Sequence, residues 1–251
     1  PWLGLGISAN NRMAESADFS NGNAKADGSL QHESVLLYFL FHRPDAGYGR
    51  TGMCHQPQHT VLCQRRLLGQ RCLVVGVPGN SGCRPAEILH YVFGRQRRNL
   101  GIHSRYIDGT VLEPGFELDE LMAPVIALES YVNQTADNAI LHDPSVMAGI
   151  QQILKTLETM RHPVIPLYET FLQPTDDEIV YPYLTYNNVL VWRAMKALAH
   201  LYPEQYGTLE QQAEAVRQTI YTHCVFRDAD QKPYFGWSVD LKGRHNVYDE
   251  P

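Results

Sequence analysis

The chain has 251 residues, a formal net charge of −6, 44% hydrophobic residues and 19% charged residues. These values describe a globular protein with enough apolar material for a sizeable core, in one or two domains of about 150 residues each. The negative charge gives no electrostatic reason to expect nucleic acid or an anionic membrane as a partner. No stretch approaches the ~20 apolar residues of a membrane span, and the oligomeric state is left open. Because the chain begins with Pro1 and ends with Pro251 behind two acidic residues, we expect it to be a piece of a longer protein.

The first 85 residues form two segments that differ from the rest. Residues 1–43 are mostly polar and indicate no role. Residues 44–85 hold four of the five cysteines, between Cys54 and Cys83, but the cysteine spacing fits no zinc-ligand pattern and the segment shows no helix or strand periodicity. Shifting a possible coding sequence for residues 67–76 by one nucleotide gives Tyr-Trp-Ala-Arg-Asp-Ala-Trp-Ser-Leu, a peptide with the character of a carbohydrate site. We hypothesise that residues 44–85 are a frame-shifted translation, which resequencing of the gene would test.

From residue 86 onward, apolar residues recur at helical spacing. Asp143 followed by Pro144 is a strong helix start. Pro124 predicts either a kink in its helix or a helix that begins near Ala123. Thr208, with a glutamine three residues later, predicts a capping box for the last helix. The expected helices cover residues 86–95, 117–132, 144–160, 187–201 and 209–220.

The helix expected over residues 187–201 is apolar almost all round, so we expect most of its circumference to be buried. Its polar side chains after residue 188 share one narrow strip: Arg193, Lys196 and His200. Such buried helices, alternating with amphipathic ones, suit a two-layer helical toroid with a buried inner ring and a solvated outer ring. Strand-like runs are short, at residues 164–167 and 234–239. We therefore expect an all-α chain with minor β additions, and His200 at its surface.

An acidic turn in the middle of the chain is the strongest indication of chemistry. Asp176 and Asp177 are adjacent, and tyrosines and the amides of Asn187 and Asn188 follow within a dozen residues. A sugar-cleaving site needs a carboxylic acid that protonates the glycosidic oxygen, aromatic rings that stack on the sugar, and amides that bind hydroxyls. The alternative is that the two acids only cap a helix in a polar turn.

Three segments, in order, resemble motifs of the metal-independent exo-α-mannosidases, which are six-hairpin glycosidases that act on α-1,6-linked mannose. They are Leu112–Pro124, Pro174–Asn188, and Trp237–Gly243 with Tyr248–Glu250. The resemblance covers about residues 86–251. Thr175 stands where the family has serine, and Glu250 stands where the second acid is usually Asp. These departures leave room for a sister group with another linkage preference.

The resemblance implies an (α/α)6 toroid that is incomplete in this chain, with residues 86–251 as a truncated catalytic-type domain. It implies inverting, exo-acting hydrolysis of a glycan or oligosaccharide without metal or other cofactor. Asp177 is the preferred proton donor, with Asp176 raising its proton affinity by like-charge repulsion. The family's catalytic base would lie beyond residue 251.

Two alternatives remain open. In glucoamylase-like six-hairpin enzymes the acid-bearing segment resembles Tyr168-Glu169 ahead of Tyr183, and Glu169 would then be the proton donor. A helical fragment that binds carbohydrate without cleaving it is the other alternative.

The expected substrate-binding residues are Arg105, Asp108, Glu117, Asp119, Tyr183, Tyr186, Asn187, Asp249 and Glu250. Each group has a plainer explanation. The acids at 117 and 119 precede a helix, where the helix dipole favours them regardless of function. Arg105 and Asp108 could form an ion pair and a turn, and the tyrosines could belong to the core.

Overall fold

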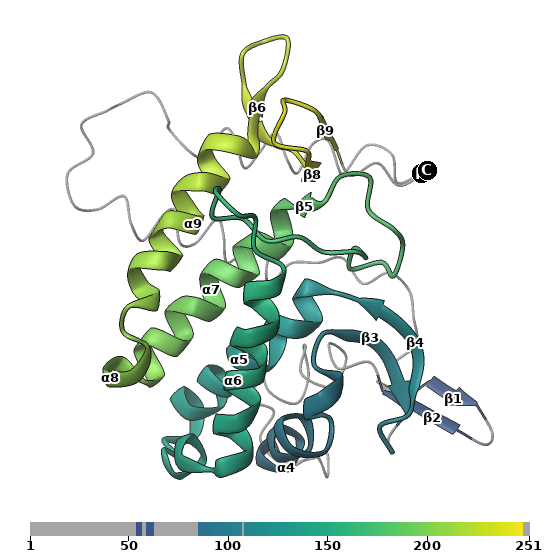
Figure 1. The fold of residues 1–251 in the computed structure, drawn as a ribbon, viewed down its shortest axis with the longest axis vertical. Coiled ribbons are helices and arrows are strands. Elements are labelled where there is room, and N and C mark those ends of the chain that lie inside the picture. Colours follow the sequence, from purple (N-terminus) through teal and green to yellow (C-terminus); the bar gives the residue numbers. More distant parts are fainter. Residues whose placement is uncertain (1–53, 57–58, 63–84, 107, 248–251) are drawn as a thin grey trace.

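The computed structural model describes residues 54–56, 59–62, 85–106 and 108–247 (Figure 1). Long helices dominate it. A π-helical turn over Tyr91–Arg95 directly follows the short helix α4. Short 3-10 turns cover Arg97–Asn99 and Ala139–His142. The α-helices are α4 (Pro85–His90), α5 (Leu118–Thr135), α6 (Pro144–Thr159), α7 (Thr185–Leu201), α8 (Pro203–Tyr206) and α9 (Leu209–His223). None of these described helices combines the length and apolar character of a membrane span.

The strands form three small antiparallel sheets. One has the order β1 (Cys54–Gln56), β2 (His59–Leu62), β3 (Ile102–Tyr106), β4 (Val111–Phe116). The second has the order β5 (Tyr183–Leu184), β8 (Ser238–Val239), β9 (His245–Asn246), and the third pairs β6 (Val225–Arg227) with β7 (Pro233–Phe235). The run expected at 234–239 is thus divided between β7 and β8, whereas the run at 164–167 is not a strand.

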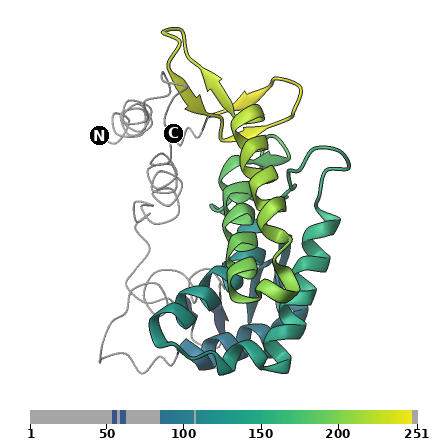
Figure 2. The same ribbon diagram turned by 90° about the vertical axis from the view of Figure 1, so that its left-hand side faces the viewer.

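Two classes of helix alternate along the chain, as the sequence predicts. α5 and α7 are buried on most of their circumference, with twelve buried residues each. α6 and α9 instead bury one stripe each, at helical spacing: Val146, Ile150, Ile153 and Leu157 in α6, and Leu209, Ala213, Val216 and Ile220 in α9. α7 packs between α5 and α9, and Figure 2 shows the long helices side by side. This is the alternation of inner and outer layers that a helical toroid requires.

Helix starts confirm some sequence predictions and correct others. The Asp143 carboxylate accepts hydrogen bonds from the amides of Ser145 and Val146 at 2.8 and 3.2 Å, so it caps α6 as expected. Pro124 lies inside α5, which begins at Leu118, so a start near Ala123 is wrong.

The capping box predicted at Thr208 is also wrong, because Thr208 makes no side-chain cap bond. Its backbone is helical (φ −65°, ψ −19°), whereas a capping residue is normally extended. α8 and Gly207 lead into α9 without the extended residue that a capping box needs.

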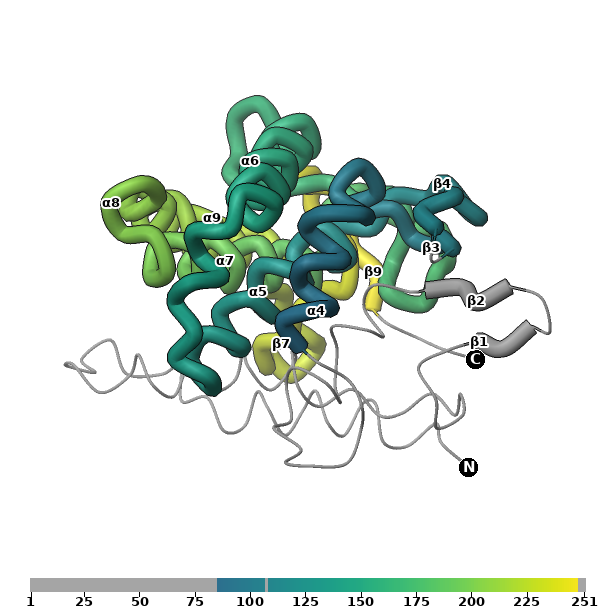
Figure 3. Tube along the Cα trace, turned by 90° about the horizontal axis from the view of Figure 1, so that it is seen from below, coloured from purple at the N-terminus to yellow at the C-terminus, as the bar shows by residue number. Residues whose placement is uncertain are grey.

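The loop from residue 168 to residue 182 connects the starts of α5 and α7. Its Thr170 hydroxyl accepts the amide hydrogen of Leu118, the first residue of α5, and the Leu172 amide donates to the carbonyl of Phe116. Gly115 makes this close approach possible, because a Cβ atom there would lie 2.3 Å from Leu172 Cδ1. The loop therefore lies at the amino-terminal ends of both inner helices, beside the hairpin β3–β4 (Figure 3).

Most of residues 44–85, and all of residues 1–43, lie outside the described residues. The described part of residues 44–85 contains β1 and β2, and β2 pairs with β3 (Val61 opposite Tyr106). These two strands form although the segment shows no strand periodicity in its sequence. Its interpretation as a frame-shifted stretch stays a prediction.

Candidate active site

Strand β3 places two basic side chains near the start of α5. His103 and Arg105 are two residues apart on β3, both are buried, and each contacts an acid at the start of α5. Arg105 Nη2 lies 3.9 Å from Glu120 Oε2, in the first turn of α5, and Nη1 donates to the carbonyl of Ile102. Arg105 therefore forms an ion pair, as the alternative to sugar binding predicts, and its partner is Glu120.

His103 lies among three carboxylates that come from different parts of the chain. Its Nε2 is 3.1 Å from Glu113 Oε2 on β4. Its Nδ1 is 3.3 Å from Glu117 Oε1 and 3.3 Å from Asp176 Oδ1. Hydrogen bonding to Glu117, together with the charges of Glu117, Asp176 and Glu113, raises the pKa of His103 to about 9 against the opposing effect of burial. The imidazole therefore carries a proton, and a positive charge, at neutral pH.

The acidic residues at the start of α5 are buried, which separates them from ordinary helix-capping acids. Glu117, Asp119 and Glu120 are each at most 1% exposed. Acids that only complement a helix dipole usually remain in water, because burying a carboxylate is costly unless it is paired. Three buried acids with His103 and Arg105 beside them favour the functional interpretation of Glu117 and Asp119, since such clusters concentrate at functional sites.

The two adjacent acids of the central turn face different surroundings. Asp176 adopts a left-handed backbone (φ 72°), which is uncommon for a residue with a side chain. Its carboxylate, half exposed, is the one that reaches His103. Asp177 is exposed, and its Oδ2 accepts a hydrogen bond from the Thr175 hydroxyl at 3.0 Å. The turn thus directs one carboxylate toward the buried cluster and presents the other to solvent.

Glu169 lies on the other side of the same loop. The Tyr183 hydroxyl donates to Glu169 Oε1 at 2.8 Å. Burial and the neighbouring carboxylate raise the pKa of Tyr183, so its hydroxyl keeps its proton. Tyr183 is buried and the structure brings these two predicted site residues together, but no contact joins Glu169 to the described cluster around His103.

Aromatic residues connect the loop to the third motif. Tyr186, at the start of α7, stacks on Trp237 with the ring centroids 6.4 Å apart. The Trp237 indole donates to Gln173 Oε1 at 2.8 Å, on the loop that bears the two acids. Asp240, the acid within the motif Trp237–Gly243, accepts hydrogen bonds from the amide and Nε of Arg244 at 2.9 and 2.6 Å. Asp240 therefore stabilises the turn between β8 and β9.

The paired asparagines of α7 differ in role. Asn188 joins α7 to the loop: its amide oxygen accepts from the Tyr168 amide, and its nitrogen donates to the carbonyls of Tyr168 and Leu184. Asn187 is 0% exposed, and neither its Oδ1 nor its Nδ2 has a hydrogen-bond partner among the described residues. Buried amides are usually satisfied, so Asn187 is the residue of this pair with capacity for a ligand.

The remaining predicted residues are peripheral or outside the described residues. Asp108 is exposed, and its carboxylate accepts the amide hydrogen of Thr110 at 2.8 Å, which supports the plainer prediction of a turn. That contact lowers the pKa of Asp108. Asp249 and Glu250 lie outside the described residues, so their role stays a prediction.

A metal ion is not expected from the sequence, but one group of described residues has the right atoms. Ligand atoms of His103, Glu117 and Asp176 lie within 4.8 Å of one another. A metal there would have to displace the proton that these carboxylates stabilise on the imidazole. The three residues therefore form an ion-pair cluster.

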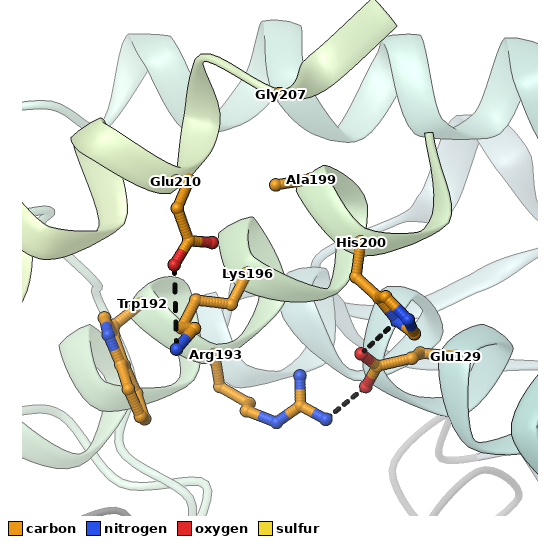
Figure 4. Close-up of a pocket in the computed structure, with 8 residues that line it drawn as sticks. All are labelled: Glu129, Trp192, Arg193, Lys196, Ala199, His200, Gly207 and Glu210. Atoms are coloured by element: carbon orange, nitrogen blue, oxygen red, sulfur yellow. Dashed lines mark hydrogen bonds and ion pairs between the residues drawn. The ribbon is translucent and has the colours of Figure 1, made fainter. Parts of the chain in front are cut away.

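A cavity of about 460 Å³ lies away from this cluster, toward the carboxyl-terminal half of α7 (Figure 4). The strip of Arg193, Lys196 and His200 lines it, and each of these side chains lies beside an acid. Arg193 contacts Glu129, His200 Nδ1 lies 3.4 Å from the same carboxylate, and Lys196 lies 3.7 Å from Glu210. His200 is exposed, as predicted. Since no predicted site residue lines this cavity, we place the candidate site at the other end of α7.

Glu113 is the contributor that was not singled out from the sequence. His103 and Glu120 lie in the short segments 103–106 and 117–120, whose residues the sequence marks as candidates for the site. Glu120 and Glu113 flank the predicted acids, and His103 joins their surroundings to Asp176. The contact of His103 with Asp176 could not have been predicted, because it joins residues far apart in the chain.

The described part of the chain is thus a helical framework with buried carboxylates gathered at the amino-terminal end of its inner helix α5. A profile of the family described as "Metal-independent alpha-mannosidase (GH125)" matches residues 161–251. This stretch is rather more than a third of the chain and includes the acidic turn and α7. The resemblance expected from the motifs is confirmed over these residues. No curated protein sequence matches the chain.

Solved structures show the fold. The chain is similar to a metal-independent alpha mannosidase of Streptococcus pneumoniae, solved as a non-productive substrate complex with alpha-1,6-mannobiose, with a TM-score of 0.58 and 12% identity over 85% of this chain and 63% of that chain. The expected (α/α)6 toroid, incomplete in this chain, is therefore confirmed, and the chain spans about 63% of that relative's length. A C. acetobutylicum ATCC 824 glycoside hydrolase from family 105 is also similar, with a TM-score of 0.46 and 12% identity over 70% of this chain and 52% of that chain. That score is too low to support an argument.

Proposed function

We propose that this chain is part of a glycoside hydrolase, a metal-independent α-mannosidase that removes single mannose residues from chain ends with inversion. In this proposal residues 86–251 form its catalytic-type domain. The observation that carries the proposal is the turn of Asp176 and Asp177, which lies beside buried carboxylates within the stretch that matches the family. The substrate of the solved relative, alpha-1,6-mannobiose, is the natural first candidate.

The chemistry follows from the requirements of inverting hydrolysis. A protonated carboxyl group gives its proton to the glycosidic oxygen as the bond to the anomeric carbon breaks, and a second carboxylate activates water on the opposite face of the sugar, ~6.5–9.5 Å away. The acid must hold its proton near neutral pH, and a neighbouring negative charge favours the protonated form.

Asp177 is the proton donor in this proposal. The imidazole of His103 lies 3.3 Å from the carboxylate of Asp176. Asp177 is the member of the pair that is exposed and can approach a substrate. The two neighbouring acids thus face different surroundings, Asp176 the histidine and Asp177 the solvent.

Residues around the turn would bind the sugar. Tyr186, half-buried and stacked on Trp237, can present its ring to a pyranose face. The Asn187 amide has both a donor and an acceptor to offer to hydroxyl groups. Arg105, Glu117 and Asp119 line the buried end of the cluster and orient the groups nearer the substrate.

The test is release of mannose from α-1,6-mannobiose by the protein, with the anomer followed by proton NMR during the first turnovers. We expect β-mannose to appear first, because inversion of an α-linkage gives the β-anomer. Initial appearance of α-mannose would contradict inversion, and binding of mannobiose without any cleavage would favour the non-catalytic alternative.

Glu169 supplies the competing assignment, as in glucoamylase-like enzymes. In the structure its carboxylate accepts the Tyr183 hydroxyl hydrogen. We expect Asp177→Asn to lower kcat on mannobiose about a hundredfold or more, the range lost with a general acid. Glu169→Gln should have a much smaller effect, and the opposite order would move the acid to Glu169. Asp230→Asn, an exposed acid in the turn between β6 and β7, is the matched control.

A further inference from the structure

His103 is the described residue that joins the acidic turn to the buried start of the inner helix α5. Its side chain is only 10% exposed, yet it contacts carboxylates on three separate segments. Glu113 comes from β4, Glu117 immediately precedes α5, and Asp176 comes from the loop between α6 and α7. A single side chain therefore connects elements that are otherwise distant in the sequence.

The charges around His103 favour the imidazolium form. Glu117 is buried, Glu113 is largely exposed, and Asp176 is half exposed. Because Glu113 contacts Nε2 while the other two contact Nδ1, carboxylates face the imidazolium on both of its nitrogen atoms. Burial disfavours the charged imidazole, but the pKa of His103 is nevertheless raised to about 9. Arg105, on the same face of β3, is engaged with Glu120 at 3.9 Å. His103 is thus the cation that faces Asp176.

The backbone of the turn needs an external contact to hold it. Asp176 is in the left-handed region at φ 72°, a conformation that a non-glycine residue keeps only when its surroundings compensate. Local hydrogen bonds close the turn, from the Asp176 amide to the Gln173 carbonyl and from the Gln173 amide to the Asp177 carbonyl. They fix its shape but do not attach it to α5. Thr170 and Leu172 attach the preceding part of the loop to the start of α5, and the contact of Asp176 with His103 attaches the tip of the turn.

We propose that His103 is a positioning residue, whose imidazole attaches the Asp176–Asp177 turn, and with it the proton donor Asp177, to the start of α5. This inference rests on the proposed hydrolase function for its catalytic consequence only. The attachment of the turn is independent of any activity. Loss of the imidazolium charge would release the turn and, with it, the position of Asp177.

The test uses His103→Gln, which keeps a polar side chain without the charge, and His142→Gln, an exposed histidine, as the control. Backbone hydrogen exchange is measured at pH 7 over residues 173–178, with α9 as the internal reference. We expect exchange in the turn of His103→Gln to rise about tenfold, the scale of one hydrogen bond to a charged group. The control should not change, and EDTA should change neither protein. Unaltered exchange in His103→Gln, or an effect of EDTA on the wild-type turn, would overturn the inference.

A second measurement remains available if His103→Gln fails to fold. In the wild-type protein, exchange of the turn relative to α9 should rise between pH 7 and pH 10 as the imidazole with its pKa of about 9 loses its proton. A ratio that stays constant over this range would overturn the attachment.

The catalytic consequence has its own signature. On mannobiose, His103→Gln should lower kcat with little change in KM, and the alkaline decline of kcat near pH 9 should disappear. An alkaline limb that persists in the variant would show a purely structural role for His103. If the wild-type protein releases no mannose, the hydrolase proposal fails while the exchange result still decides the attachment.

Discussion

Loss of the His103 charge should make the stability of the protein depend less on pH. The pKa of His103 is raised from 6.5 to about 9 in the folded protein. A raised pKa means that the folded state binds the proton more tightly than the unfolded chain does. The stabilisation is therefore complete below pH 6.5 and is lost as pH rises from 6.5 toward 9.

The size of this effect follows from the shift. Each pKa unit corresponds to about 1.4 kcal/mol, so the rise of His103 to about 9 is worth about 3 kcal/mol in the free energy of unfolding. The side chain is largely shielded from solvent, so screening by water is limited.

The assay is urea unfolding of wild type, His103→Gln and His142→Gln at intervals between pH 6 and pH 9.5. The free energy of unfolding should be higher for the wild type than for His103→Gln at pH 6, and this difference should be about 3 kcal/mol smaller at pH 9.5. The free energy of unfolding of His142→Gln should equal that of the wild type at every pH. A difference between wild type and His103→Gln that is the same at both ends of the range would refute the ion-pair cluster, because any pH-independent packing loss gives a constant offset.

Two further predictions concern the framework of the site. Asn188→Ala should destabilise the protein by about 3 kcal/mol in urea unfolding, because it removes three buried hydrogen bonds and leaves the backbone of Tyr168 without partners. Gly149→Ala should lower the unfolding free energy by about 1–3 kcal/mol, because its Cβ would lie 2.4 Å from Cδ1 of the buried Phe93.

Matched controls separate these effects from general sensitivity of the helices. Asn138→Ala removes an exposed amide that makes one long hydrogen bond of 3.4 Å, and it should change stability little. Gly94→Ala places a Cβ atom 3.6 Å from Ser145, an ordinary contact distance, and should be tolerated. Equal losses in each variant and its control would contradict the packing argument.

The helices could be predicted because their apolar periodicity follows the burial. α6 and α9 bury residues at helical spacing, and α7 is buried nearly all round, as its composition indicates. β3 could not be predicted in this way. Its central residues, His103, Ser104 and Arg105, are all buried, so polar side chains stand where a buried strand normally carries apolar ones.

The candidate site was predictable only in its parts. The acidic turn and the acids before α5 are visible as local motifs, but burial of Glu117 and Asp119 is a tertiary property. The sequence likewise does not reveal the left-handed backbone of Asp176 or its contact with His103, since both depend on how the loop packs against β4. The local sequence motif pointed to the two adjacent acids, whereas the packing of the loop determines that Asp176 and not Asp177 contacts His103.

The most direct measurement of the central claim compares two substrates in Asp177→Asn. Mannobiose has a poor leaving group that needs a proton, whereas a dinitrophenyl α-mannoside releases an acidic phenol that does not. If Asp177 donates the proton, kcat/KM should fall about a hundredfold or more on mannobiose and far less on the dinitrophenyl substrate. An equal fall on both substrates, or no fall on either, would contradict the assignment of Asp177 as the acid of a mannoside hydrolase.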